Sequence, residues 1–190
     1  MPWSARYLMN LQARGRPLPT GRPEDLLERA IEQLSLPDVE QAIHAGANPD
    51  GMGANALHLA LDVAERRGEP LREGSRLASL VITLLRCRTR LDQVDRRTQL
   101  TVPERLLAMP STSAVGWAMA HLPQHVLSAP PGRRPPLATL VAHGTAETVA
   151  LFPVQHPHWG WREGAGPTLA ERWAQRQADG AVPPRRRLSP

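Results

Sequence analysis

Hydrophobic residues recur every three or four positions in several stretches of the chain, which is the spacing of an amphipathic helix. Residues 24–34 show the pattern most clearly, because a proline precedes them and two acidic residues stand in the first turn. Both features favour a helix N-terminus. The pattern therefore predicts a helix over 24–34, with the apolar positions Leu26, Leu27, Ala30, Ile31 and Leu34.

A second helix is predicted directly after the break at residues 35–37. It covers residues 38–45 and ends at Gly46, where a residue without Cβ can take the left-handed conformation that closes a helix. The two helices are expected to form an antiparallel pair. Further helices are predicted at 55–67, 75–88, 102–108, 113–122, 135–143 and 145–152 and from 168 onward, with an insert at 68–74.

The loop at residues 46–60 leads into the best-marked helix start of the chain. Asn55 is a favoured N-cap, and an apolar run begins two residues later at Leu57. The segment Gly53-Ala54-Asn55-Ala56-Leu57-His58-Leu59-Ala60 resembles the ankyrin repeat, whose signature is Gly, one variable residue and Thr-Pro-Leu-His-x-Ala. Asn55 and Ala56 replace the Thr and Pro. The resemblance implies that His58 hydrogen-bonds loop backbone between neighbouring repeats, and it carries no reaction.

Leucines at corresponding places in this pattern recur close to the ankyrin period of about 33 residues. Leu27 and Leu57 are 30 residues apart, Leu106 and Leu137 are 31 apart, and Leu137 and Leu169 are 32 apart. The interval between Leu57 and Leu106 is 49, which an insert after Arg67 explains. We therefore expect an all-α, ankyrin-like helical-repeat solenoid of about four to five helix pairs with irregular ends.

Three parts of the chain are distinguished. Residues 1–23 form an N-terminal arm with a short helical face that carries Trp3 and Tyr7, and we expect it to pack against the first repeat. Residues 24–177 form the repeat domain. Residues 178–190, rich in Pro and Arg, are expected to be a disordered tail.

Composition changes this picture in two ways. The chain is 41% hydrophobic but only 4% aromatic, so its core has to be built from Leu, Ala and Val. All 23 basic residues are arginine, and the formal net charge is +5. The absence of lysine reflects either the bias of a GC-rich genome or selection against lysine-directed modification inside a foreign host cell. Because the arginines stand in scattered pairs, nucleic acid is an unlikely partner.

A single cysteine, Cys87, excludes an internal disulfide framework, and its apolar surroundings favour a buried small hydrophobe. No signal peptide is recognisable, and no segment approaches the roughly 18 apolar residues of a membrane span. We therefore expect a cytoplasmic protein without a membrane partner, although secretion without a signal peptide stays open.

Catalytic motifs are absent from the sequence, so we expect no enzyme. His156 and His158, with His143 nearby, are the only cluster of metal-ligand type, and no cysteine or spaced carboxylate completes a tetrahedral set. We expect no metal and no cofactor.

Partner-binding residues are expected in the loops between helix pairs. The segment Trp159-Gly160-Trp161-Arg162 concentrates the residue types of interface hot spots. An extended loop would place both tryptophans on one side, facing a partner or folded back onto Trp173. The candidates are Asp50, Met52, Asp95, Arg96, Arg97, Trp159, Trp161 and Arg162.

These features favour a non-enzymatic protein-binding module, an adaptor or an inhibitor of the immunity-protein type, which uses its loops and the concave helix face. One alternative is a secreted bacterial effector that acts on a host protein. A weaker one is a nucleic-acid-associated protein.

Overall fold

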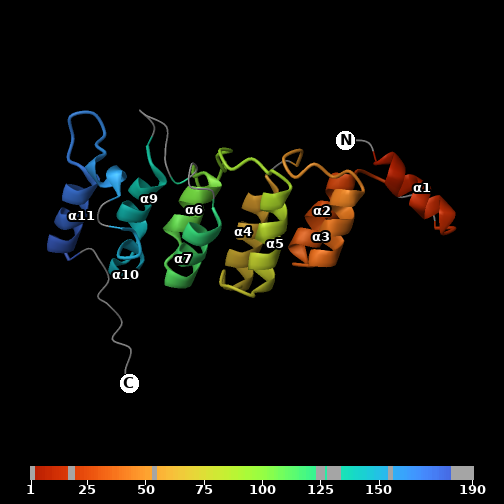
Figure 1. The fold of residues 1–190 in the computed structure, drawn as a ribbon, viewed down its shortest axis with the longest axis horizontal. Coiled ribbons are helices and arrows are strands. Elements are labelled where there is room, and N and C mark those ends of the chain that lie inside the picture. The colour runs from red at the N-terminus through yellow and green to blue at the C-terminus, as the bar shows by residue number, and fades with distance from the viewer. Residues whose placement is uncertain are drawn as a thin grey trace, which may run out of the picture. The chain divides into compact units, whose positions relative to one another are not determined.

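A computed structural model describes residues 3–16, 20–52, 55–122, 127, 134–153 and 156–180. Within these ranges the regular secondary structure consists of ten α-helices and one 3-10 helix (Figure 1). The expectation of an all-α fold is thereby confirmed for the described residues. The chain divides into two units, Met1–Arg97 and Thr98–Pro190, each with its own internal packing.

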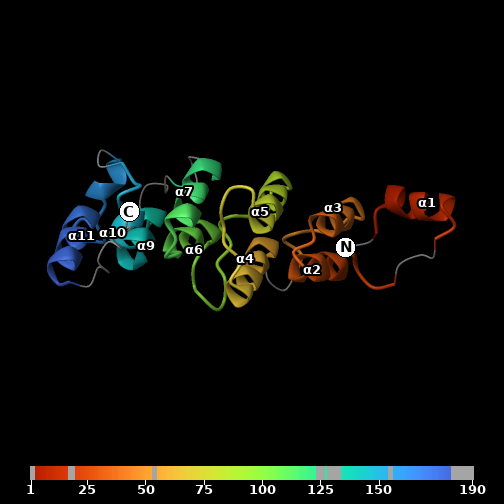
Figure 2. The same ribbon diagram turned by 90° about the horizontal axis from the view of Figure 1, so that it is seen from below.

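The first unit contains two antiparallel helix pairs preceded by a short helix. α2 packs against both α3 and α4, and α5 packs against both α3 and α4 (Figures 1 and 2). The core between them is built largely from fully buried leucines such as Leu27, Leu57 and Leu80. The helices are α1 (Ala5–Ala13), α2 (Pro23–Glu32), α3 (Leu36–His44), α4 (Ala56–Arg67) and α5 (Arg76–Arg86).

The ends of these helices follow the local chemistry of the sequence. α2 ends two residues before the predicted boundary because Leu34 turns the chain with a φ of 53°. Gly46 has a φ of 101°, which is the positive value expected of a glycine that closes a helix. The side chain of Asn55 accepts a hydrogen bond from the backbone N–H of Leu57 at 2.8 Å, as its predicted role as N-cap requires. The predicted turn at Gly53 lies outside the described residues.

The N-terminal arm contacts α3 through polar atoms. The backbone N–H of Ser4 donates to the carbonyl of Ala45 at 2.7 Å, and the amide of Gln41 donates to the hydroxyl of Tyr7 at 3.2 Å. No residue of α1 is buried. The arm is therefore held by hydrogen bonds and partial burial rather than by a core of its own.

The second unit repeats the paired arrangement. α6 packs against α7 and α9, α10 packs against α7 and α9, and α11 packs against α9 and the 3-10 helix η1 (Figures 1 and 2). Leu106, Leu137 and Leu169 are fully buried between these helices. The elements are α6 (Val102–Ala108), α7 (Thr112–His121), α9 (Pro136–His143), α10 (Ala146–Val149), η1 (Pro157–Gly160) and α11 (Leu169–Ala178).

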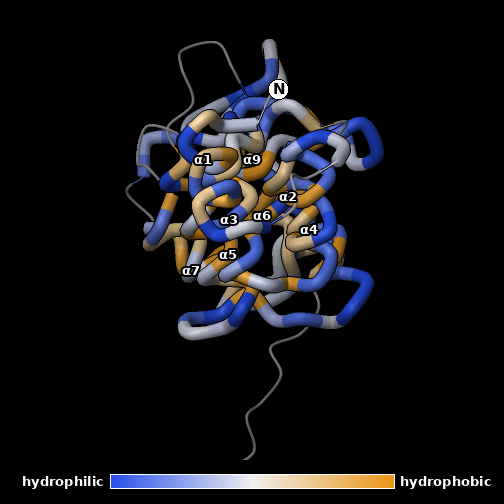
Figure 3. Tube along the Cα trace, turned by 90° about the vertical axis from the view of Figure 1, so that its right-hand side faces the viewer, coloured by the Kyte–Doolittle hydropathy of each residue, from blue (hydrophilic) through white to orange (hydrophobic). Residues whose placement is uncertain are grey.

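Hydrophobic residues, orange in Figure 3, lie along the labelled helices, and the connecting loops are mostly hydrophilic. None of the described helices has both the length and the apolar composition that crossing a bilayer requires; the longest of them, α4, has 12 residues.

The N-caps of the first helices give the interval between pairs. They are Arg22, Asn55, Thr101, Pro135 and Thr168. The intervals within the two units are 33, 34 and 33 residues, and 46 residues separate Asn55 from Thr101. The leucines compared in the sequence are not equivalent positions, because Leu27 is the fifth residue of its helix and Leu57 the second. Counting from the caps corrects the interval from 30 to 33.

Two further expectations are corrected by the structure. The helix predicted over 145–152 is only the four-residue α10, because the chain turns at Leu151. Cys87 is half-buried at the C-cap of α5 rather than in the core. Its partial burial raises the pKa of the thiol, which keeps the sulfur protonated.

Candidate functional site

Asp50, one of the expected partner-binding residues, ties two loops of the first unit together. Its carboxylate accepts hydrogen bonds from the backbone N–H of Arg90 at 3.0 and 3.2 Å and from the side-chain amide of Asn55 at 2.9 Å. The same amide donates to the carbonyl of Arg90 at 2.8 Å. Asp50 is therefore a structural residue that fixes the loop after α5 against the start of α4.

His58 lies beside this network. The ring is buried, and Nε2 is 2.9 Å from the backbone carbonyl of Gln93. The hydrogen bond to loop backbone that the sequence resemblance implied is thus present. Because the imidazole is committed to that loop, it offers no exposed acid or base.

Arg97 and its neighbours form a charged surface on α4. The guanidinium of Arg97 donates to Asp62 at 2.7 Å and to Glu65 at 2.9 Å. The hydrogen bond to Glu65 is the largest cause of a raised pKa of Arg97, and the hydrogen bond to Asp62 raises the pKa further. Asp95 accepts from the backbone N–H of Arg97 at 3.3 Å, while Arg96 is exposed.

The last candidate in this unit, Met52, is half-exposed in the loop before α4. Of the candidates in this unit, Arg96 and Arg97 are exposed, and Asp50, Met52 and Asp95 are half-buried.

The tryptophan-rich segment of the second unit is not the extended loop that the sequence indicated. Residues 157–160 form η1, and the ring N–H of Trp159 donates to the carbonyl of Pro153 at 3.0 Å. Trp161 caps η1, and its carbonyl accepts from the N–H of Leu169 at 2.9 Å. Arg162 pairs through its backbone with Thr168. A 3-10 turn does not alternate its side chains, so the two tryptophans do not share one site.

Trp159 forms one wall of an apolar groove of about 460 Å³ between α10 and α11. Phe152 and Trp173 contribute the other aromatic surfaces, and three alanines keep the groove shallow enough for a chain to approach. The lining residues are Ala146, Val149, Ala150, Phe152, Trp159, Ala170, Trp173 and Gln177. Trp161 and Arg162 are not among them. An apolar groove with aromatic walls suits an aliphatic or aromatic side chain of another molecule.

Most of this groove was missed in the sequence. Ala170, Trp173 and Gln177 follow one another at helical spacing, so the shared face on α11 was a readable signal. Phe152 and Trp159 come from different elements, and no local pattern joins them to α11.

Arg176 fixes α11 against the end of α9. One guanidinium nitrogen donates to the carbonyls of Val141 and Gly144, both at 2.8 Å. The guanidinium also lies over the ring of Trp173, 5.8 Å from its centre. The contacts of Arg176 with α9 and with the ring therefore hold Trp173 in place as a wall of the groove.

A histidine pair stands behind Trp159. The ring centres of His156 and His158 are 4.8 Å apart, and Nδ1 of His156 accepts from the backbone N–H of His158 at 3.3 Å. Burial lowers the pKa of both imidazoles, and the neighbouring His158 lowers that of His156 further. Among the described residues, no group of three or more His, Cys, Asp or Glu is arranged to hold a metal ion.

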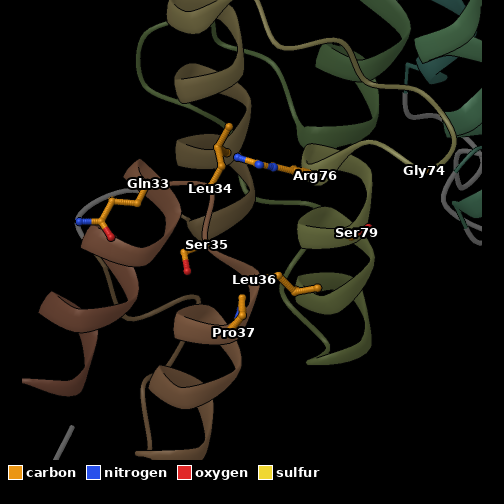
Figure 4. Close-up of a pocket in the computed structure, with 8 residues that line it drawn as sticks. All are labelled: Gln33, Leu34, Ser35, Leu36, Pro37, Gly74, Arg76 and Ser79. Atoms are coloured by element: carbon orange, nitrogen blue, oxygen red, sulfur yellow. The ribbon is translucent and has the colours of Figure 1, made fainter.

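A second, polar groove of about 390 Å³ lies in the first unit, between the α2–α3 turn and the start of α5. Figure 4 shows the side chain of Arg76 extending toward Leu34, while Gln33 points away. The hydroxyl of Ser35, at its edge, donates to Asp38 at 2.6 Å. The lining contains guanidinium, amide and hydroxyl groups but no imidazole, thiol or carboxylate.

The geometry thus offers an apolar groove in the second unit, and a polar groove and the loops around Met52, Arg96 and Arg97 in the first. Comparison of the chain with protein-family models, curated proteins and solved structures found no match.

Proposed function

We propose that the protein is a non-enzymatic protein-binding module and that the apolar groove between α10 and α11 is its main contact surface. The observation that carries the proposal is the groove itself, where Phe152, Trp159 and Trp173 surround an open, uncharged space. Aromatic side chains around an apolar depression are typical of interface hot spots. Trp159 and Trp173 are only half-buried, so part of each ring faces solvent.

The scaffold of this module is proposed to be a helical-repeat solenoid similar to ankyrin repeats. Three facts support it: the interval of 33 or 34 residues between first helices within each unit, the packing of neighbouring pairs within each unit, and the hydrogen bond of His58 to loop backbone. Such arrays serve as binding scaffolds because their stacked pairs expose loops and helix faces over a large area.

Phosphate binding receives less support from the contacts. Arg97 pairs with two carboxylates, Arg90 with Asp92 at 3.2 Å, and Arg172 with Glu163 at 3.5 Å. Arginines paired in this way would have to exchange a carboxylate for a phosphate, which reduces the gain from nucleic-acid binding.

Affinity capture with the full chain, followed by reconstitution with the purified partner, tests the proposal. We expect a protein that binds the purified chain in isothermal titration calorimetry, with an affinity that changes little between low and high salt. The proposal fails if no captured protein binds when purified. It also fails if binding requires nucleic acid and falls steeply with added salt.

A further inference from the structure

The groove occupies a definite place in the helix-pair pattern. In the first unit, α5 packs on the first helix of its own pair, α4, and on the second helix of the preceding pair, α3. In the second unit, α11 is a first helix that packs on α9, and the preceding second helix is α10. Among the described residues, which end at Gly180, no helix follows α11. The groove between α10 and α11 therefore lies where a second helix would pack.

The groove also has the surface of a helix-packing site. Its three lining residues on α11, Ala170, Trp173 and Gln177, lie on one face and span seven residues, or about 10 Å at 1.5 Å per residue. On the opposite wall, Ala146 and Ala150 are one helical turn apart on α10. Small residues on both walls let another backbone come close, since the distance between packed helices depends on the side chains at the contact.

The charged residues of α11 leave this face uncovered. With 100° per residue, Ala174 continues the face of Ala170, and it is exposed. Glu171 and Arg172 project from other parts of the helix, and Arg176 is drawn toward the end of α9. A helix with an uncharged, solvent-exposed side of this width is typical of one that has a packing partner.

The remaining residues of the chain do not have the composition of that partner. Residues 181–190 contain two large aliphatic residues beside three prolines and three arginines. A helix that fills the groove needs apolar residues at i, i+3 or i+4, and i+7. This sequence contains no such series, so residues 181–190 do not supply the occupant.

We propose that the groove binds an amphipathic helix of a partner protein, which takes the position of the second helix of the α11 pair. This inference rests on the proposed function and specifies the chemistry of the partner. The bound helix lies along α11, with a large aliphatic or aromatic side chain between Trp159 and Trp173. Its other apolar side chains lie over Ala150, Ala170 and Ala174.

Site-specific photo-crosslinking in the source cells tests the proposal with the full chain. The photoreactive residue p-benzoylphenylalanine replaces Gln177, which lines the groove, or Gln175, which is equally exposed on the opposite side of the same helix. A third position, Met52, reports on the loops of the first unit. We expect position 177 to crosslink one protein at least tenfold more efficiently than position 175. Mass spectrometry of the crosslinked peptide should place it in a segment with apolar residues at helical spacing.

A blocking variant separates loss of the site from loss of the fold. Ala170→Glu places a charge in the groove at an exposed position, and Gln175→Glu adds the same charge outside it. Both variants should keep the helicity of the wild type by circular dichroism, and only Ala170→Glu should abolish the crosslink from position 177.

The remaining outcomes would overturn the inference and are distinguishable from one another. A crosslink to an extended or non-helical segment, to a second copy of this chain or to its own residues 181–190 shows a different occupant. Crosslinking from Met52 alone contradicts the groove while leaving the protein-binding function intact. Absence of a protein crosslink at all three positions contradicts both.

Discussion

At the scale of single residues, Asn55 links three separate segments of the first unit. Its side-chain oxygen caps α4 through Leu57, and its side-chain nitrogen donates to Asp50 and to the carbonyl of Arg90. The residue is buried, so water cannot replace these partners. One amide thereby joins the start of α4 to the loop before it and to the loop after α5.

Replacement of Asn55 by alanine should lower the free energy of unfolding by about 2 to 3 kcal/mol. Loss of a cap costs about 1 kcal/mol, and loss of the part-buried hydrogen bonds to Asp50 and to the carbonyl of Arg90 costs about as much again. Ser75→Ala is the matched control, because Ser75 caps α5 through Ala78 at 3.1 Å and joins no second loop. We expect about 1 kcal/mol for it, measured by urea denaturation. Equal losses for the two variants would show that the bonds of Asn55 to the loops contribute nothing.

The sequence predicted the cap chemistry of individual residues better than their accessibility. Asn55 was identified as a cap because its residue type and its place before a helix determine that role, and the hydrogen bond of His58 to loop backbone was implied by the resemblance to the ankyrin repeat. Asp50 and Arg97 were expected to contact a partner, and each also has partners within the fold: Asp50 accepts from Arg90, and Arg97 donates to Asp62 and Glu65. Such partners stand 32 to 40 residues away in the chain. No local pattern indicates them.

At the scale of single elements, α11 depends on Arg176 for its attachment. The last carbonyls of α9 carry the negative end of that helix, and Arg176 donates to two acceptors there. Of the residues of α11, only Leu169 is fully buried. The attachment of α11, and with it one wall of the groove, therefore depends largely on the hydrogen bonds of Arg176.

Arg176→Met should detach α11 from α9 and raise its amide hydrogen exchange, with a local loss of about 2 kcal/mol. This is the usual size for hydrogen bonds from a charged donor. Arg172→Met, on the same helix, removes an exposed pair with Glu163 at 3.5 Å and should cost less than about 1 kcal/mol. Exchange followed by mass spectrometry compares the two. If Arg172→Met exposes α11 as much as Arg176→Met, the contact with α9 is not what holds the helix.

The 3-10 helix η1 should weaken in mild acid. Burial lowers the pKa of His156 and His158 below 6.5, so the unfolded chain takes up protons before the folded one. Stability that is present above pH 6.5 is lost as the pH falls through the lowered values. Protonation of His156 would also remove the acceptor at Nδ1 that binds the N–H of His158.

Unfolding in urea at pH 7.5, 6.5 and 5.5 measures this dependence. Carboxyl groups titrate mostly below this range and contribute little to the slope. The double variant His156→Asn/His158→Asn should flatten the decrease relative to the wild type. An unchanged slope in the variant would mean that other groups cause the acid sensitivity.

At the scale of the whole molecule, the two units have separate leucine-rich cores. The sequence predicted the pairs and their order, since apolar spacing and caps are local features. It also located the long interval, because residues 68–75 separate α4 from α5 and residues 87–101 separate α5 from α6. The groove could not be predicted in this way. It exists because α10 is short and because Phe152, Trp159 and Trp173, from three elements, converge.

Leu57→Ala and Leu137→Ala test whether the two units unfold separately. Each leucine is the second residue of a first helix, and both are 0% exposed, so the two substitutions are matched. Each should cost about 3 kcal/mol, because a cavity is added to the lost burial. In helical repeats, each repeat is stabilised by its interface with the next one. Because the long interval between α4 and α6 interrupts the repeats, each substitution should destabilise only its own unit. We expect Leu57→Ala to raise amide exchange in α2 to α5 and to leave α9 to α11 at wild-type protection. Leu137→Ala should do the reverse. Equal loss of protection in both units from either substitution would mean that the chain unfolds as one cooperative body.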